Sequence, residues 1–363
     1  MISLPAPLRS FASDNAAGVH PTVMQALVEA NTGHALAYGD DVHTAEMQSR
    51  ILDLFGGNAR GFAVWGGTGA NVMALATMLG PAQAVICTNW AHINVDETGA
   101  PERILGAKLI DIPCPDAKLR PEHLVEQCRE LGNLHHVQPG VVSLTQSTEV
   151  GTMYSPDEIA ALCETAHRLG MTVHLDGARL ANAVAAAGGT VAELRAMTTQ
   201  AGVDVVSFGA TKNGMMYGEV VVYLNERMAK VAPYVRKQVT QLPSKMRFIS
   251  AQINALLRDD LWIAQAQHSN RMAMYLYERT HDIPGVRYDA PPVVNSVFAR
   301  LPVAAIEPLR EWCFFWDWDV ASHQVRWMTA WDTTIEDVDV FARGVREILM
   351  GFAMIRKILA QYN

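Results

Sequence analysis

The stretch VVSLTQSTEVGTMYSPDEIAALCETAHRLGMTVHLDGAR, residues 141–179, decides the fold class. It contains two β-branched runs, at 141–145 and 172–175, each of the length of a buried strand. Between them, apolar residues recur at helical spacing from 156 to 169. Ser155 is suited to cap this helix and Pro156 to stand in its first turn. A strand, a helix and a second strand in this order indicate a largely parallel α/β sheet.

Apolar runs of the same kind flank this unit and extend the pattern. Further strands are predicted at 84–87, 203–208 and 219–224, with helix-like segments between them. We therefore expect residues 1–250 to form an N-terminal arm and a large α/β domain, with a mostly parallel sheet flanked by helices. At 363 residues the chain can bury a large core, and its length favours about two domains.

The pattern changes after about residue 250. A long helical stretch is predicted first, followed by two short strands and a closing helix, at 251–280, 296–301, 324–329 and 335–359. A proline-rich segment around Pro291 and Pro292 is typical of a loop. Residues 251–363 are therefore expected to form a smaller C-terminal α+β domain.

Composition excludes several classes of function. The 363 residues carry 37 acidic and 29 basic side chains, a net charge of −8, which disfavours binding to nucleic acid or to anionic membranes. No apolar run has the length of a membrane span, and residues 1–13 do not resemble a signal peptide, so a cytoplasmic protein is expected. The five cysteines include no CxxC pair, which favours reduced thiols over disulfides, and no cluster has the spacing of metal ligands.

The first candidate ligand-binding segment is Gly66-Gly67-Thr68-Gly69, between an apolar run and a helix-like run at 72–79. Glycines let backbone amides approach a ligand closely, and a helix N-terminus attracts anions. The segment therefore suits a phosphate group. Taken alone, it is equally compatible with an ordinary turn from strand to helix, and it matches neither a Walker loop nor a dinucleotide-binding motif.

Two further segments place reactive side chains directly after predicted strands. Asp176 precedes Gly177, at the kind of strand end where open α/β sheets bind ligands, and a carboxylate there could keep a pyridine nitrogen protonated. Lys212 lies between glycines and follows the strand at 203–208, where a desolvated amine readily forms an imine. The alternatives are a turn aspartate and a surface lysine.

Taken together and in this order, the three segments resemble the aspartate-aminotransferase-like group of pyridoxal phosphate enzymes. Within that group the chain resembles the low-specificity L-threonine aldolases over nearly its whole length. The matching segments are Phe11-Ala12-Ser13-Asp14-Asn15, Tyr38-Gly39-Asp40-Asp41, Gly67-Thr68-Gly69-Ala70-Asn71, Ala91-His92 with Glu97, His174-Leu175-Asp176-Gly177-Ala178-Arg179, Lys212, Ser244-Lys245-Met246-Arg247 and Arg326 with Trp331-Asp332-Thr333. The sequence departs from the common pattern at Gly66, where the family usually has Ser, and in the loop 213–218.

The resemblance implies how the cofactor is held. Lys212 would carry pyridoxal 5′-phosphate covalently, and Asp176 would contact the pyridine nitrogen. Arg179 would lie near the cofactor and the substrate carboxylate. The phosphate would be bound by the amides of the cradle and by one hydroxyl; these residues are Gly67, Thr68, Gly69 and Thr211.

The resemblance also implies which residues meet the substrate. His92 would stack on the cofactor and act as acid or base on the substrate hydroxyl, with Trp90 as the competing stacking residue. His135 matches a family histidine near that hydroxyl, although His136 is an alternative. Arg326 and Ser13 would bind the α-carboxylate, a task that suits a bidentate guanidinium.

Two more residues imply an assembly. In the family, Tyr38 would contribute to substrate binding and Arg247 to cofactor binding in a neighbouring subunit's active site. A homodimer or homotetramer with shared active sites is therefore expected.

The activity implied by the resemblance is cleavage of L-threonine, L-allo-threonine and related β-hydroxy-α-amino acids, such as 3-phenylserine, to glycine and an aldehyde. Catalysis of this kind needs no metal. The alternatives are another enzyme of the same fold, such as a β-eliminating lyase or an aminotransferase, and a non-catalytic binding protein. His92 favours the aldolase, because aminotransferases usually have Tyr, Phe or Trp at that position.

Overall fold

A computed structural model describes residues 4–361 of the chain and divides it into two compact units. The larger unit is Val19–Ile263, and the smaller one combines Met1–Gly18 with Ala264–Asn363. The division differs from the predicted boundary at 250/251. Helix α11 (Arg247–Leu257) packs on α1 (Pro21–Ala30) and α2 (Val42–Phe55) and so belongs to the larger unit. The N-terminal segment groups with the smaller unit, where the Phe11 ring lies 4.4 Å from that of Phe341, centroid to centroid.

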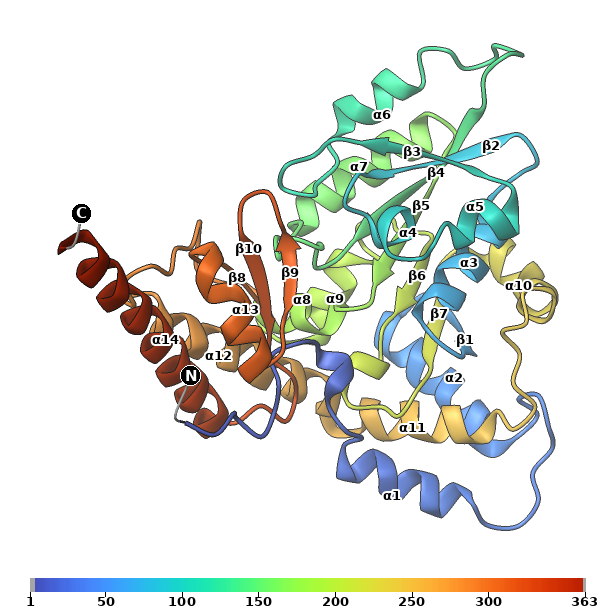
Figure 1. Ribbon diagram of the computed structural model, residues 1–363. Helices are drawn as coiled ribbons and strands as arrows, with labels where there is room; N and C mark the ends of the chain where they lie inside the picture. The colour runs from blue at the N-terminus through green and yellow to red at the C-terminus, as the bar shows by residue number, and fades with distance from the viewer. Residues whose placement is uncertain (1–3, 362–363) are drawn as a thin grey trace. The chain divides into compact units, whose positions relative to one another are not determined.

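The larger unit is built on a seven-stranded sheet with the order β1-β7-β6-β5-β4-β2-β3 (Figure 1). The strands are β1 (Arg60–Val64), β2 (Gln83–Thr88), β3 (Lys108–Ile112), β4 (Gln138–Thr145), β5 (Thr172–Gly177), β6 (Val205–Phe208) and β7 (Glu219–Tyr223). Strand β7 runs antiparallel to both of its neighbours, β1 and β6, and the other neighbouring pairs in this sheet are parallel. The predicted mostly parallel α/β sheet is confirmed, with β5 in the middle.

Burial explains which strands could be predicted. The central strands are covered on both faces and are therefore continuous apolar runs; in β7 every residue is buried. Strand β3, at the edge, has the sequence KLIDI, and only Leu109 in it is fully buried, so no continuous apolar run marks it.

Helices cover both faces of this sheet. Helix α3 (Gly67–Met78) crosses one face and contacts α5 (Ala100–Leu105) and α10 (Glu226–Gln238). On the other face, α2 and α7 (Pro156–Arg168) both contact α9 (Val191–Met197). Shorter helices are α4 (His92–Val95), α6 (Pro121–Gln127) and α8 (Leu180–Ala186).

The start of α7 follows its predicted chemistry. The Ser155 hydroxyl accepts a hydrogen bond from the Glu158 amide at 3.2 Å, and the Glu158 carboxylate accepts one from the Ser155 amide at 2.7 Å. This reciprocal capping box satisfies amides that the first turn leaves without helical partners. The helix between β4 and β5 therefore begins where the sequence predicts.

The smaller unit has a three-stranded antiparallel sheet with the order β8-β10-β9. Its strands are β8 (Ser296–Arg300), β9 (Trp316–Asp319) and β10 (Gln324–Met328), and its helices are α12 (Leu261–Thr280), α13 (Val303–Trp312) and α14 (Ile335–Gln361). The core contains the fully buried rings of Phe315, Trp327 and Phe341. Strand β9 is not predicted from the sequence.

The long helix predicted at 251–280 is interrupted. Helix α11 ends at Leu257, and the short 3-10 turn η3 (Arg258–Asp260) precedes α12. Asp259 and Asp260 both have φ of 53°, a left-handed backbone that cannot continue an α-helix. Across the described residues, no helix combines the length and apolarity that a membrane crossing would need.

Candidate active site

Asp176 lies at the carboxyl end of β5, in the middle of the larger sheet. Its Oδ1 accepts a hydrogen bond from the Ala178 amide at 3.0 Å, and its Oδ2 accepts one from Asn71 Nδ2 at 2.8 Å. Burial by itself would raise the pKa of Asp176, but the neighbouring His174 and these hydrogen bonds hold the pKa below its usual value. The result is a buried carboxylate anion that can pair with a cationic nitrogen.

His174 supports the same strand two residues earlier. Its ring is fully buried, with Nδ1 2.9 Å from Ser143 Oγ on β4 and Nε2 2.9 Å from Ser207 Oγ on β6. Burial lowers the pKa of His174 to about 4, so the ring is neutral at pH 7. His174 therefore links the three central strands beside Asp176.

A hydrogen-bonded chain connects Asp176 to His92. Asn71, on α3, donates from Nδ2 both to Asp176 and to Glu97 Oε1, the latter at 2.9 Å. The same Glu97 oxygen lies 3.0 Å from His92 Nδ1. The hydrogen bond to Glu97 raises the pKa of His92 and outweighs the opposing effect of burial. The structure thus joins two predicted site residues through Asn71 and Glu97, for which the sequence alone suggests no role.

A third acid, Glu149, lies beside this chain; the residue is half-buried, but its carboxylate oxygen Oε2 is buried. Glu149 follows β4, and its Oε1 accepts hydrogen bonds from the His92 backbone amide at 3.0 Å and from the Thr145 hydroxyl at 2.8 Å. Burial raises the pKa of Glu149 to about 7, and the negative charge of Asp176 acts in the same direction. The sequence around Glu149 has no motif that would have found it; only its position after a strand end is informative.

Lys212 lies in the 3-10 turn η2 (Thr211–Asn213), just after β6. The Glu219 carboxylate, at the start of β7, accepts hydrogen bonds from the amides of Ala210 and Thr211 and fixes this turn. Lys212 is partly buried, and its positive charge acts to lower the pKa of both His92 and Glu219. At His92 the hydrogen bond to Glu97, which raises the pKa, is the larger effect. At Glu219 burial, which also raises the pKa, is the larger effect. The amine of Lys212 therefore interacts electrostatically with both His92 and Glu219.

The glycine cradle lies at the N-terminus of α3. A Cβ added at Gly66 or Gly67 would meet no atom of the described residues within 4 Å, so there is open space beside the Cα atoms of both residues. At Gly69 an added Cβ would stand 2.3 Å from the Gln241 side chain, whose Oε1 accepts a hydrogen bond from the Trp65 amide at 3.1 Å. Amides at a helix N-terminus fit an anion such as phosphate. Gln241 is an unpredicted neighbour of this cradle.

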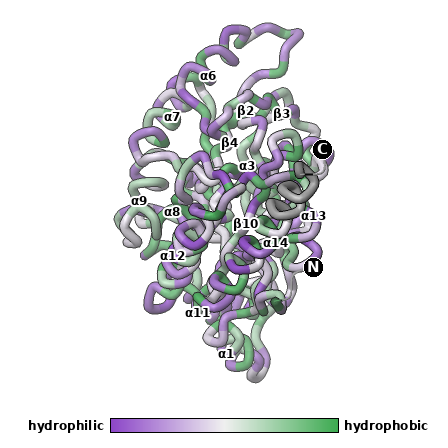
Figure 2. Tube along the Cα trace, turned by 60° about the vertical axis from the view of Figure 1, so that its left-hand side comes forward, coloured by the Kyte–Doolittle hydropathy of each residue, from purple (hydrophilic) through white to green (hydrophobic). Residues whose placement is uncertain are grey.

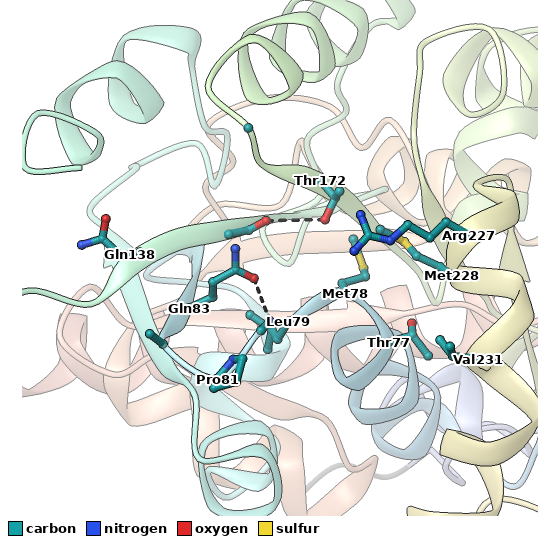
Figure 3. A pocket seen from close by; sticks show the side chains of 14 residues that line it. Thr77, Met78, Leu79, Pro81, Gln83, Gln138, Thr172, Arg227, Met228 and Val231 are labelled. Carbon is teal, nitrogen blue, oxygen red and sulfur yellow. Dashed lines mark hydrogen bonds between the residues drawn. The ribbon is translucent and has the colours of Figure 1, made fainter. Parts of the chain in front are cut away.

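A separate cavity of about 660 Å³ opens at the other end of the sheet (Figure 3). It is lined by the first residues of three strands, Gln83, Gln138 and Thr172, together with Arg227 from α10. The residues that line it include none of the predicted site residues. Because the reactive groups gather at the carboxyl ends of the strands, we place the candidate site there and not in this cavity.

Comparison with known proteins identifies the family. The model of the beta-eliminating lyase family matches residues 10–303. The low-specificity L-threonine aldolase of Pseudomonas aeruginosa is 42% identical over 344 residues, which cover 94% of this chain and 98% of that protein. This chain belongs to the threonine aldolase group of the beta-eliminating lyases. A second such aldolase, from a Pseudomonas species, is 40% identical with the same coverage.

A solved structure agrees with this membership. The threonine aldolase of Leishmania major superimposes with a TM-score of 0.85 at 30% identity, over 93% of this chain and 99% of that one. The resemblance seen in the sequence is therefore confirmed at the level of the family and of the fold. Among the predicted cofactor residues, Gly67 follows β1, Asp176 lies at the carboxyl end of β5, and Lys212 follows β6. Arg179 lies directly before α8.

His135 lies apart from these residues within the described chain. It lies in the exposed loop between α6 and β4, where its amide donates to the Asn133 side chain at 3.1 Å. This hydrophilic segment beyond α6 stands at the rim of the larger unit (Figure 2). The loop precedes β4, whereas Glu149, His92 and Asp176 all follow strand ends. Within the described chain His135 does not lie with His92 and Asp176, and its role near the substrate hydroxyl stays a prediction.

The remaining predicted residues lie in two places. Tyr38 and Arg247 are on the surface of the larger unit: the Tyr38 amide donates to the Ser244 carbonyl at 2.9 Å, and Arg247 donates to the Gly33 carbonyl at 3.1 Å. Ser13 and Arg326 belong to the smaller unit, where the Arg326 guanidinium lies 4.5 Å from the centre of the Trp318 ring. Their contacts with substrate or with another subunit stay predictions.

Proposed function

We propose that this protein is a pyridoxal phosphate-dependent threonine aldolase. It would cleave L-threonine, L-allo-threonine and related β-hydroxy-α-amino acids to glycine and an aldehyde. The observation that carries the proposal is the hydrogen-bonded chain from Asp176 to His92, next to Lys212, in a member of the threonine aldolase group. Neither a β-eliminating lyase nor an aminotransferase is favoured, because the nearly full-length relatives at 42% and 40% identity are both named threonine aldolases.

The residues present fit pyridoxal phosphate. Lys212 offers the amine, Asp176 a buried anion for the pyridine nitrogen, and the glycine-lined N-terminus of α3 at Gly67 a site for the phosphate. When bound, the cofactor supplies an electron sink that stabilises negative charge on the α-carbon of the substrate. The Thr211 hydroxyl donates a hydrogen bond to the Gly218 carbonyl at 3.1 Å. In this arrangement the hydroxyl can only accept a hydrogen bond from a ligand, so its predicted contact with the phosphate would require the hydroxyl hydrogen to turn away from Gly218.

The side chains of the protein then have separate tasks. Arg326 and Ser13 would bind the α-carboxylate and so orient the bond between the α- and β-carbons. His92 would move the proton of the β-hydroxyl, a step suited to a ring whose pKa a neighbouring carboxylate adjusts. Burial of Asp176 and Glu97 keeps water from competing for their hydrogen bonds.

The test is a comparison of wild type with Lys212→Ala, using Lys108→Ala on the exposed edge strand as the control. We expect a yellow wild type and control that release acetaldehyde from L-threonine, measured with a coupled dehydrogenase. The Lys212→Ala variant should bind the cofactor without the colour of a lysine-bound form and release no acetaldehyde. A yellow protein that makes a keto acid and ammonia would reject the aldolase, and a protein that stays colourless with added cofactor would reject the cofactor as well.

We further propose a cytoplasmic homodimer or homotetramer with shared active sites. The segment that contains Tyr38 exposes several apolar side chains: Leu36 at 73%, Tyr38 at 51% and Val42 at 77% of their surface. Contiguous exposed apolar residues are typical of protein interfaces. The predicted reach of Tyr38 and Arg247 into a neighbouring subunit is consistent with this surface.

A further inference from the structure

A single oxygen atom of Glu97 receives two hydrogen bonds. Oε1 is 2.9 Å from Asn71 Nδ2 and 3.0 Å from His92 Nδ1, and the Glu97 side chain is fully buried. A carboxylate can only accept hydrogen bonds, so Nδ1 of His92 must carry a proton in this contact. Proton gain and loss by the ring is therefore confined to Nε2.

Asn71 connects Glu97 to Asp176 by hydrogen bonds. Its amide nitrogen has two N–H groups, and both are used, one toward Glu97 and the other toward Asp176 at 2.8 Å. Two buried carboxylates would otherwise repel each other across this small space. The amide thus donates one hydrogen bond to each carboxylate and orients both.

We propose that Glu97 is a positioning residue: it fixes His92 with the proton on Nδ1, so that Nε2 is the atom that exchanges a proton with the substrate hydroxyl. Through Asn71 the same carboxylate helps to orient Asp176. The inference rests on the proposed aldolase function, and it assigns to Glu97 and Asn71 a role that neither motif nor family membership supplies.

The charges around His92 determine whether its pKa should rise or fall when the negative charge of Glu97 is removed. Glu97 and Asp176 favour the protonated ring, whereas burial and the charge of Lys212 disfavour it; Glu149 contacts only the His92 backbone amide. Without the Glu97 charge, the lowering of the His92 pKa by burial and by the charge of Lys212 would be less opposed. The pKa of His92 should then fall.

The decisive variant is Glu97→Gln. The amide oxygen of Gln accepts the same two hydrogen bonds, so the ring keeps its orientation while the negative charge is lost. In the holoenzyme with labelled histidine, we expect the His92 ring signals to titrate about 1 pH unit lower than in wild type, the size of effect that an adjacent opposite charge has. The limb of the kcat/KM profile that reports His92 should move by the same amount, with cofactor affinity and colour unchanged.

Three further variants complete the experiment. His92→Asn identifies the resonance, and Glu164→Gln, an exposed acid on α7, should leave both titrations at their wild-type positions. Glu97→Leu removes the acceptor, and we expect signals from both ring tautomers and a loss of kcat of tenfold or more, larger than in Glu97→Gln.

An unchanged His92 titration in Glu97→Gln would overturn the inference, as would equal kinetic defects in Glu97→Gln and Glu97→Leu. Failure of the proposed function is distinguishable from this result. A protein without aldolase activity would still show, by magnetic resonance alone, whether Glu97 controls the protonation of His92.

Discussion

At the scale of the residue, the candidate site combines buried groups whose ionisation has opposite consequences for stability. His174 has a lowered pKa and stays neutral in the fold, so its contribution is lost as the pH falls below the ordinary histidine value. Glu149 has a pKa raised to about 7, so the fold prefers its protonated form. Its contribution is complete below the ordinary value of 4.5 and is lost as the pH rises through 7.

Glu149→Gln tests this sign directly. The variant cannot ionise, so its free energy of unfolding relative to wild type should increase from about pH 4.5 to about pH 8, by at most about 3 kcal/mol. Any pH-independent cost of the new amide cancels in this difference, as does the contribution of His174. Urea unfolding of both proteins across this range measures it, and a difference that stays constant with pH would show that Glu149 ionises normally.

At the scale of the element, the turn that carries Lys212 depends on close contact between the ends of β5 and β6. A Cβ added at Gly209 would stand 2.4 Å from the Ala178 carbonyl oxygen, a backbone atom that cannot move aside alone. We expect Gly209→Ala to destabilise the protein by about 1–3 kcal/mol, as overpacking does, and to weaken cofactor binding. Spectroscopic titration with pyridoxal phosphate and thermal unfolding measure the two effects.

Gly66 is the matched control for that variant. It precedes α3 in an extended conformation with φ of −170°, which any residue adopts, and an added Cβ would meet nothing in the described residues. Gly66→Ala should therefore change stability and cofactor affinity little. Equal losses in both variants would mean that the glycines act through backbone flexibility and not through the contact with Ala178.

Much of this arrangement follows from the sequence, for physical reasons that also show its limits. Asp176 and Lys212 could be predicted because one lies at the end of a buried strand and the other shortly after the end of a buried strand. Glu149 and the partnership of Asn71 with Glu97 could not, because three segments distant in sequence converge only in the fold. His135 was assigned by its match to a family histidine, and its role near the substrate hydroxyl stays a prediction.

At the scale of the whole molecule, the exposed apolar segment around Tyr38 predicts that the active protein is an assembly. Replacement of both Leu36 and Val42 by Asp would place charges in the proposed interface, where burying an unpaired charge is costly. We expect the double variant to sediment as a smaller species than wild type and to lose activity, because Tyr38 and Arg247 would no longer reach a neighbouring site. Leu134→Asp, at a position 98% exposed in the loop after α6, should leave both properties unchanged.

Analytical ultracentrifugation at several protein concentrations, with activity measured on the same samples, separates the possible outcomes. If activity falls in proportion to the fraction of dissociated subunits, the site depends on residues of a neighbour, as the positions of Tyr38 and Arg247 suggest. If the dissociated variant keeps its full activity, each subunit has a complete site and the apolar segment serves stability alone. A wild type that is monomeric and active at every concentration would instead require another explanation for three large apolar side chains exposed on one short segment.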